Sequence, residues 1–279
     1  MSFLCPACGD TVASSRRAQH EELWCSALGD SGEEQEHLEA SSSGPGAAAS
    51  RLLDLNTRAR SVTSATLSSG LRLSFLEVSV FASGTATGGA LWASSLLLAE
   101  WALRHAGGGG AVLELGCGAC PAAGIAAASR GAPTVMTDRG GVVELAEANL
   151  RRNLAAVEAA AGGPLAREVF DTAVFEWGGE IPARVLALGP LDCVLVGDCI
   201  FSERTHALLL DALARLLLGG ARRAVLAYQR RSQPLEAAFF RLAEERHGLR
   251  AELVTDAASL KALLGGRGEG LELVALRLK

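Results

Sequence analysis

The chain has 279 residues, of which 49% are hydrophobic and 20% charged, and its formal net charge is −5. This acidic balance argues against a dedicated nucleic-acid-binding protein, which is usually basic. No apolar stretch reaches membrane-spanning length without a charge. The first ten residues lack the charged-then-apolar layout of a secretory signal. We therefore expect a cytoplasmic or nuclear protein that does not bind a membrane, with its seven cysteines reduced or bound to metal.

The first segment of the chain, residues 1–28, has the spacing of a zinc site. Cys5, Cys8, His20 and Cys25 form the pattern C-x2-C-x11-H-x4-C. Two cysteines in a tight knuckle and a His/Cys pair on a helix make a tetrahedral zinc set. The segment resembles the small C2HC zinc fingers, some of which bind ubiquitin. We expect a structural zinc ion, whose binding supplies folding energy that so short a segment lacks.

The next segment, residues 29–50, is rich in Gly, Ser, Ala and Glu, which is the composition of a flexible linker. From residue 51 to residue 279, short apolar runs alternate with helical patterns. The expected strands are 71–80, 111–115, 134–138, 191–198, 223–229, 250–256 and 271–279. The expected helices are 91–105, 121–129, 142–160, 204–217 and 235–247.

This alternation predicts an α/β fold in which helices cover both faces of a mostly parallel sheet. The last two strands have no clear long helix between them, so we expect an antiparallel strand at one edge. In such a fold, ligands bind at the carboxyl ends of the strands, where the chain connections switch direction.

The stretch VLELGCG ends the predicted strand 111–115 and places Gly116 and Gly118 at such a strand end. The next glycine, Gly124, is too far along for the G-x-G-x-x-G spacing of a dinucleotide loop. Asp138 ends the next strand and could accept hydrogen bonds from both hydroxyls of a ribose. Glu114 suits a positively charged ligand. S-adenosylmethionine (SAM), which carries a ribose and a sulfonium, fits these residues.

Several motifs in this order resemble the family of seven-β-strand protein methyltransferases that modify lysines of valosin-containing protein, of chaperones and of calmodulin. The resemblance covers residues 70–278. The motifs are TGGALWASSLLLAEWAL (87–103), VLELGCGACPAAGIAAASRGAPTVMTD (112–138), NLRRN (149–153), FEWG (175–178), LDCVLVGDCIF (191–201) and AYQRR (227–231). It implies a Rossmann-like, seven-stranded class I methyltransferase sheet and a SAM-dependent protein-lysine methyltransferase.

The resemblance also implies roles in SAM binding. Trp92 would lie over the SAM pocket, and Gly116, Cys117 and Gly118 would form the loop near the methionine part. Asp138 would hold the ribose. Two further residues would border the cofactor, with a tryptophan against the adenine and a glycine contributing its backbone: Trp177 and Gly197. The chain departs from many relatives at Ala93, where they carry Asp or Pro, and at Cys117 and Cys120, where small residues are usual.

For the methyl acceptor, the segment from Asp198 to Phe201 matches the D-x-x-Y or D-x-x-F motif that the family places beside the target side chain. Asp198 would orient the lysine amine or accept a proton, and Phe201 and Trp92 could contact a cation through their rings. The alternative for Asp198 is a cap of the helix that begins near Ser202. Arg231 would either meet an acidic substrate or lie in a solvated loop.

Three alternatives remain at this stage. A C-x-x-C redox site at Cys117 and Cys120 would also sit at a helix start, but the nucleotide-loop pattern favours two packing residues. The motifs DCIF and AYQRRS also resemble a branch of the family thought to modify arginine. A catalytically inactive SAM-fold adaptor could act through its zinc finger. The partners we expect are a protein substrate and, through the finger, ubiquitin or another protein.

Overall fold

The computed structural model describes residues 2–4, 11–13, 59–78, 86–165 and 170–279. The chain divides into two compact units, Met1–Asp54 and Leu55–Lys279. In the first unit, β1 (Ser2–Leu4) pairs antiparallel with β2 (Thr11–Ala13). The predicted zinc ligands and the predicted linker 29–50 lie outside the described residues.

The second unit is built on a seven-stranded sheet with the order β10-β11-β9-β8-β5-β6-β7. Its strands are β5 (Ala111–Leu115), β6 (Thr134–Asp138), β7 (Phe170–Val174), β8 (Leu191–Gly197), β9 (Ala224–Gln229), β10 (Leu249–Leu253) and β11 (Leu271–Leu278). The pairs from β9 to β7 are parallel, and β11 is antiparallel to both β9 and β10. The expected antiparallel pairing of the last two strands at one edge is therefore confirmed, with β10 outermost and β11 running against both of its neighbours.

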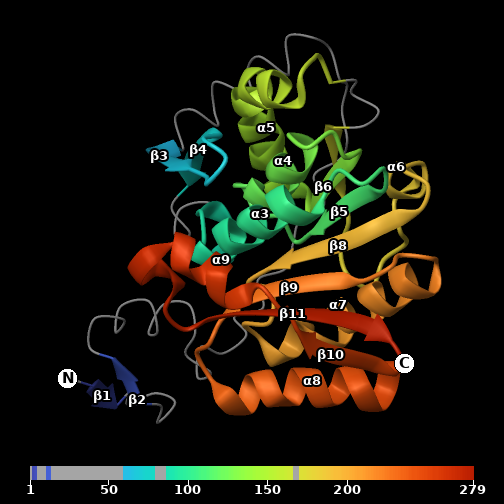
Figure 1. Cartoon of the computed structure of the whole chain (residues 1–279). Helices are drawn as coiled ribbons and strands as arrows, with labels where there is room; N and C mark the ends of the chain where they lie inside the picture. The colour runs from blue at the N-terminus through green and yellow to red at the C-terminus, as the bar shows by residue number, and fades with distance from the viewer. Residues whose placement is uncertain (1, 5–10, 14–58, 79–85, 166–169) are drawn as a thin grey trace, which may run out of the picture. The chain divides into compact units, whose positions relative to one another are not determined.

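Helices cover both faces of this sheet (Figure 1). One face carries α3 (Ala93–His105), α4 (Ala122–Ala128) and α5 (Gly140–Ala161), and the other carries α7 (Glu203–Leu218) and α8 (Gln233–His247). Shorter helices are α6 (Ala183–Leu186), α9 (Ala257–Leu263), η3 (Ala86–Gly89) and η4 (Gly265–Gly268). Successive strand residues point to opposite faces. Accordingly, Val112 joins the core under α3 and α4, while Leu113 joins the core under α7.

A separate two-stranded hairpin, β3 (Ala59–Thr66) and β4 (Arg72–Val78), is tied to α5 by two buried asparagines. Asn149 Oδ1 accepts from Leu76 N at 2.7 Å, and Asn149 Nδ2 donates to Leu76 O at 2.9 Å. Asn153 makes the same pair of bonds with the backbone of Ser74. Each amide therefore mimics a strand neighbour and satisfies both backbone groups of one β4 residue.

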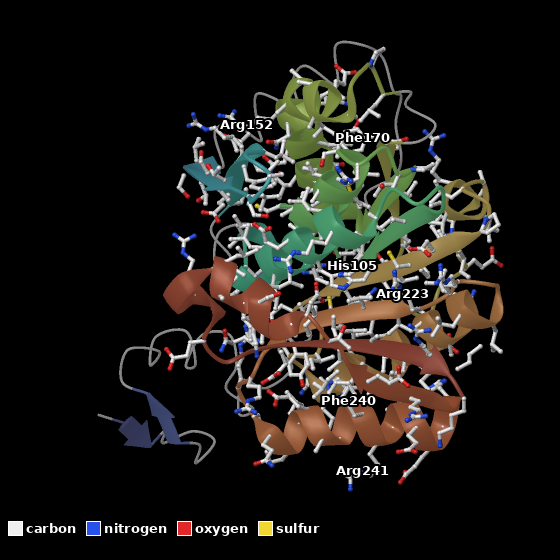
Figure 2. All side chains as sticks on the ribbon, viewed as in Figure 1. His105, Arg152, Phe170, Arg223, Phe240 and Arg241 are labelled. Atoms are coloured by element: carbon white, nitrogen blue, oxygen red, sulfur yellow. The ribbon has the colours of Figure 1, made fainter. Side chains whose placement is uncertain are left out.

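At the amino ends of the strands, charged and aromatic groups pack together. The Trp101 ring stacks on His105 with centroids 4.8 Å apart, and the Arg223 guanidinium lies 4.8 Å from the Trp101 centroid. Arg223 also pairs with Asp192. His105 and Arg223 are labelled in Figure 2, where on α8 Phe240 points toward the sheet and Arg241 away from it. This end of the sheet is stabilised by the protein's own ion pairs.

Within the described ranges, none of the helices combines the length and the apolar character needed to cross a lipid bilayer.

Candidate active site

The order in which successive strands are added to the sheet reverses at β5. The chain passes from β5 to β6 on one side, and β8 pairs with β5 on the other. A crevice for a ligand forms at such a switch point, at the carboxyl ends of the strands. The segment Gly116–Gly118 follows β5, Asp138 ends β6, Trp177 lies beyond β7, and Gly197 and Asp198 end β8. The fold therefore brings predicted site residues of three separate motifs to one end of the sheet.

The glycine loop after β5 needs both of its glycines. Gly116 has a φ of 71° and Gly118 a φ of 63°, in the left-handed region that side chains disfavour. A Cβ at Gly116 would lie 2.7 Å from Cys199 Sγ and 2.9 Å from Trp177 Cζ2. The loop backbone therefore passes close to the Trp177 ring, which no residue with a side chain would allow.

Asp138 fixes the loop through its carboxylate. Its Oδ2 accepts from Gly118 N at 2.9 Å, and its Oδ1 accepts from Arg139 N at 2.8 Å. Burial raises the pKa of Asp138 despite these two hydrogen bonds, which act in the opposite direction. A carboxylate oxygen accepts more than one hydrogen bond, so Asp138 retains acceptor capacity for the hydroxyls of a ribose.

Glu114 lies in the middle of the fold, 1% exposed, on the face of β5 that α4 covers. Its Oε2 accepts from Gly124 N at 2.7 Å, in the first turn of α4. Burial raises the pKa of Glu114 to about 8, and the neighbouring Asp138 adds to this effect. The Glu114 carboxyl group thus contacts the start of α4, where it satisfies a backbone N–H that has no partner within the helix.

The cysteines of the loop are packing residues. Cys117 and Cys120 are free and buried. Burial raises the pKa of both thiols above their usual value, and the Cys117 thiol donates to Gly118 O at 3.2 Å. A redox cysteine needs a lowered pKa and solvent access. The burial of both thiols therefore favours two packing residues over the C-x-x-C redox alternative.

The helix α3 begins beside the carboxyl end of β8. Trp92 is its N-cap residue, and Trp92 O accepts from Ser95 N at 3.1 Å. A Cβ at Gly197 would lie 3.1 Å from Ser95 Oγ, so α3 approaches the end of β8 closely at this position. The first turn of α3, which follows Trp92, therefore packs against the carboxyl end of β8.

Asp198 is the most constrained residue of the site. Among the described residues it is the one non-glycine residue with a positive φ, at 58°. It is 8% exposed, and its carboxylate accepts from Arg231 Nη1 and Nη2 at 2.6 Å each. Strained backbone of this kind persists where the surroundings over-determine it, often at functional sites.

The helix-cap alternative for Asp198 does not hold. The N-cap of α7 is Ser202, and no side chain caps that helix. Asp198 instead accepts from Gln229 N at 3.3 Å, in addition to Arg231. Phe201, three residues after Asp198, is partly buried between β8 and α7.

Sequence reasoning missed two residues that shape the site. Arg231 was expected in solvent or against a substrate, but its side chain is 17% exposed and pairs with Asp198. Asn149, inside the motif NLRRN, also donates to Ala119 O at 2.7 Å and so holds the loop from behind. The sequence did contain one indication of a role for Asn149, because it places an asparagine on the apolar face of a predicted helix. Arg231 gave no such signal, because its partner lies 33 residues away.

Comparison with models of known protein families identifies the family of this chain. A family model described as lysine methyltransferase matches residues 77–246, which is more than half of the chain. The chain belongs to this lysine methyltransferase family. A model described as C2HC zinc finger matches residues 1–26. Comparison with curated protein sequences gave no significant match.

Solved structures with a similar fold include SAM-dependent methyltransferases. A TehB-like enzyme from Corynebacterium glutamicum is 17% identical, with a TM-score of 0.42 over 70% of this chain and 91% of the other. Magnesium protoporphyrin IX methyltransferase from Synechocystis, solved with bound SAH, is also 17% identical, with a TM-score of 0.40 over 65% and 80%. A putative methyltransferase from Streptococcus mutans is 13% identical, with a TM-score of 0.46 over 78% and 55%. These TM-scores are below 0.5, so the family match identifies the chain.

The predicted fold and chemistry are confirmed at the level of the family. The sheet, with its one antiparallel strand β11 inserted beside β9, is the Rossmann-like methyltransferase sheet. The protein is a SAM-dependent methyltransferase that acts on a protein substrate, and its N-terminal residues 1–26 match a C2HC zinc-finger model. The roles of individual residues, and the partner of the finger, remain predictions.

Proposed function

We propose that this methyltransferase transfers the methyl group of SAM to a lysine side chain held beside Asp198 and Phe201. The observation that carries the proposal is Asp198 itself. It is a buried carboxylate on strained backbone, and it follows Gly197 at the switch point where the glycine loop ends β5.

The residues around the crevice fit the parts of SAM. The backbone of Gly116–Gly118 would face its methionine part, Asp138 would bind the ribose hydroxyls, and Trp177 would stack on the adenine. Two residues at the mouth would border the sulfonium end: Trp92 and Gly197. The orientation of Asp138 is already set by Gly118 N and Arg139 N, so its carboxylate would need no rearrangement to receive the ribose.

When bound, SAM supplies a methyl group on a sulfonium, which leaves as a neutral thioether. The lysine nitrogen uses its lone pair to form the new N–C bond, while the electrons of the C–S bond return to sulfur. The methylammonium product then loses its proton to solvent. Such a reaction needs alignment more than covalent help, so the task of Phe201 and Trp92 is to exclude water and direct the amine.

The zinc finger would recruit a protein partner, either ubiquitin or the substrate itself, in the cytoplasm or the nucleus. Its match to the C2HC model supports a folded binding module but does not identify what it contacts. The simplest test is to compare the proteins labelled by the full chain with and without Cys25→Ser. Loss of some labelled proteins, with the remainder unchanged, would support recruitment through the finger.

The first experiment is transfer of labelled methyl from SAM into an extract of the source cells, followed by amino-acid analysis of the labelled protein. We expect methyl-lysine. Methyl-arginine would overturn the lysine assignment and favour the arginine-modifying branch. Absence of label, despite measurable SAM binding, would favour the inactive adaptor.

A variant pair then tests Asp198. Asp198→Ala should lower transfer at least about a hundredfold while SAM affinity changes little, because the change removes the carboxylate beside the acceptor and leaves the glycine loop and Asp138 in place. Asp211→Ala is the matched control. Asp211 is also an acidic residue paired with an arginine, but its side chain is 49% exposed on α7. Equal transfer by the two variants would remove Asp198 from the acceptor site.

A further inference from the structure

The Asp198–Arg231 pair has the geometry of a planar fork. Arg231 Nη1 lies 2.6 Å from Asp198 Oδ1, and Arg231 Nη2 lies 2.6 Å from Asp198 Oδ2. The two side chains are 17% and 6% exposed. Bidentate pairs of this kind are the strongest charge-assisted hydrogen bonds that proteins make. Because they are buried, solvent screens them little.

Arg231 is held in place from its backbone as well. Its N–H donates to Glu236 Oε1 at 2.7 Å, and Glu236, on α8, is 8% exposed. The guanidinium carbon lies 5.7 Å from the centroid of the Trp92 ring, within range of a cation–π contact. Three elements, the end of β8, the start of α8 and the start of α3, therefore converge on this one cation.

The charge of Asp198 matters for the chemistry of the acceptor. A lysine has a pKa of about 10.4 and arrives as an ammonium ion, which has no lone pair to attack a methyl group. An unpaired carboxylate within about 4–6 Å would stabilise that ammonium and raise the pKa of the lysine by about 1–3 units. A neighbouring cation has the opposite effect and favours the free amine. A lone Asp198 beside the acceptor would therefore hinder the reaction that the site performs.

We propose that Arg231 neutralises the Asp198 carboxylate, so that the acceptor lysine is held in the site as the free amine and Asp198 acts as an oriented hydrogen-bond acceptor. Arg231 is in this sense a positioning residue, since it acts through Asp198. The inference rests on the proposed placement of the acceptor beside Asp198. It also replaces the alternative that Asp198 takes the proton, because the adjacent guanidinium favours the ionised form of the carboxylate.

Other ionisable groups near the pair have assigned contacts. Glu236 is bonded to the backbone of Arg231 and Ser232. Asp138 and Glu114 are bonded to backbone N–H groups of the loop, and burial keeps the Cys199 thiol protonated by raising its pKa. Exposed Arg230, next in sequence, pairs with Glu272 on β11. Arg231 is therefore the cation that directly contacts the carboxylate at the end of β8.

The test is the pH dependence of single-turnover methyl transfer at saturating SAM, with the acceptor protein purified from the labelled extract. The rate rises with pH as the bound lysine loses its proton. In Arg231→Met the uncompensated carboxylate should shift this rise to higher pH by at least about one unit. The double variant Arg231→Met/Asp198→Asn should return the rise to its wild-type position. Arg230→Met, the exposed neighbour, should leave it unchanged.

A merely structural role for Arg231 would lower the rate equally at every pH. A wild-type pH profile in Arg231→Met, with wild-type SAM affinity, would overturn the proposal. If Arg231→Met does not fold, the single variant Asp198→Asn provides the test. This variant keeps the Arg231 cation and removes the Asp198 anion. The rise of its transfer rate with pH should therefore move to lower pH, with turnover still measurable. An unmoved profile, or no turnover with SAM still bound, would refute the proposal, the latter because it would make Asp198 the base.

A second readout does not depend on turnover. Calorimetry in buffers of different ionisation enthalpy measures the protons released when the acceptor protein binds to the enzyme–SAH complex. Subtracting the value for an acceptor with its target Lys→Met isolates the lysine. Wild type should release more protons per acceptor than Arg231→Met at the same pH. Equal release by the two enzymes would refute the proposal, whereas failure of the proposed function would show earlier, as absence of labelled lysine.

Discussion

The carboxyl group of Glu114 makes the stability of the ligand-free protein depend on pH in a way that one substitution can remove. Burial raises its pKa from 4.5 to about 8 in the folded protein. Between these values the unfolded chain is ionised at this position, while the folded protein still holds the proton. The folded state thus binds more protons, and the free energy of unfolding falls as pH rises.

The size of this effect follows from the shift. One pH unit within the window changes the free energy of unfolding by about 1.4 kcal/mol per group. From about pH 5.5 to about pH 7.5, Glu114 should therefore lower the stability of the wild type by about 3 kcal/mol. Glu114→Gln keeps an oxygen that can accept from Gly124 N and cannot ionise, so this contribution should vanish.

Urea unfolding of both proteins at several pH values, without SAM, measures the difference. The gap between Glu114→Gln and the wild type should move in favour of the variant as pH rises through this window. Parallel pH dependences of the two proteins would refute the reasoning, because they would mean that Glu114 ionises in the folded state as readily as in the unfolded chain.

Three further predictions concern the loop, the hairpin and the zinc finger. Gly116→Ala should weaken SAM binding at least about tenfold by calorimetry, because the new Cβ would clash with Trp177 and force an unfavourable φ. Asn149→Leu should lower the free energy of unfolding by about 2–5 kcal/mol in urea titrations, since it leaves buried backbone groups of the hairpin and the loop unpaired. Treating the full chain with a strong chelator should remove about one zinc ion, measured by atomic absorption, and leave SAM affinity unchanged.

The strands and helices of the second unit were largely predictable because their apolar runs are short and well separated. The predicted strands 111–115 and 134–138 match β5 and β6. Four strands and α-helices of this unit were missed: the strands β3 and β7, and the short helices α6 and α9. Their sequences carry too little hydrophobic periodicity to be read alone.

The positions of site residues could be predicted where the residues belong to one sequence motif. They could not be predicted where the contact joins two segments that are distant in the sequence. The glycine loop and Asp138 lie where their motif indicated. The position of β11 between β9 and β10 depends on which strands pair with each other, and local sequence patterns do not indicate strand pairing. The Arg231–Asp198 pair depends on the same sheet order, which brings the loops after β8 and β9 side by side.

Asn149 joins two parts of the chain that open separately in many proteins. One amide nitrogen donates both to Leu76 O in the hairpin and to Ala119 O in the cofactor loop. Local opening of α5 would release both partners together, so the hairpin and the loop belong to one cooperative unit. A ligand that binds only the closed loop stabilises that whole unit by mass action. Amide hydrogens of residues 72–78 should therefore exchange more slowly with solvent when SAM is bound, although SAM would not touch them.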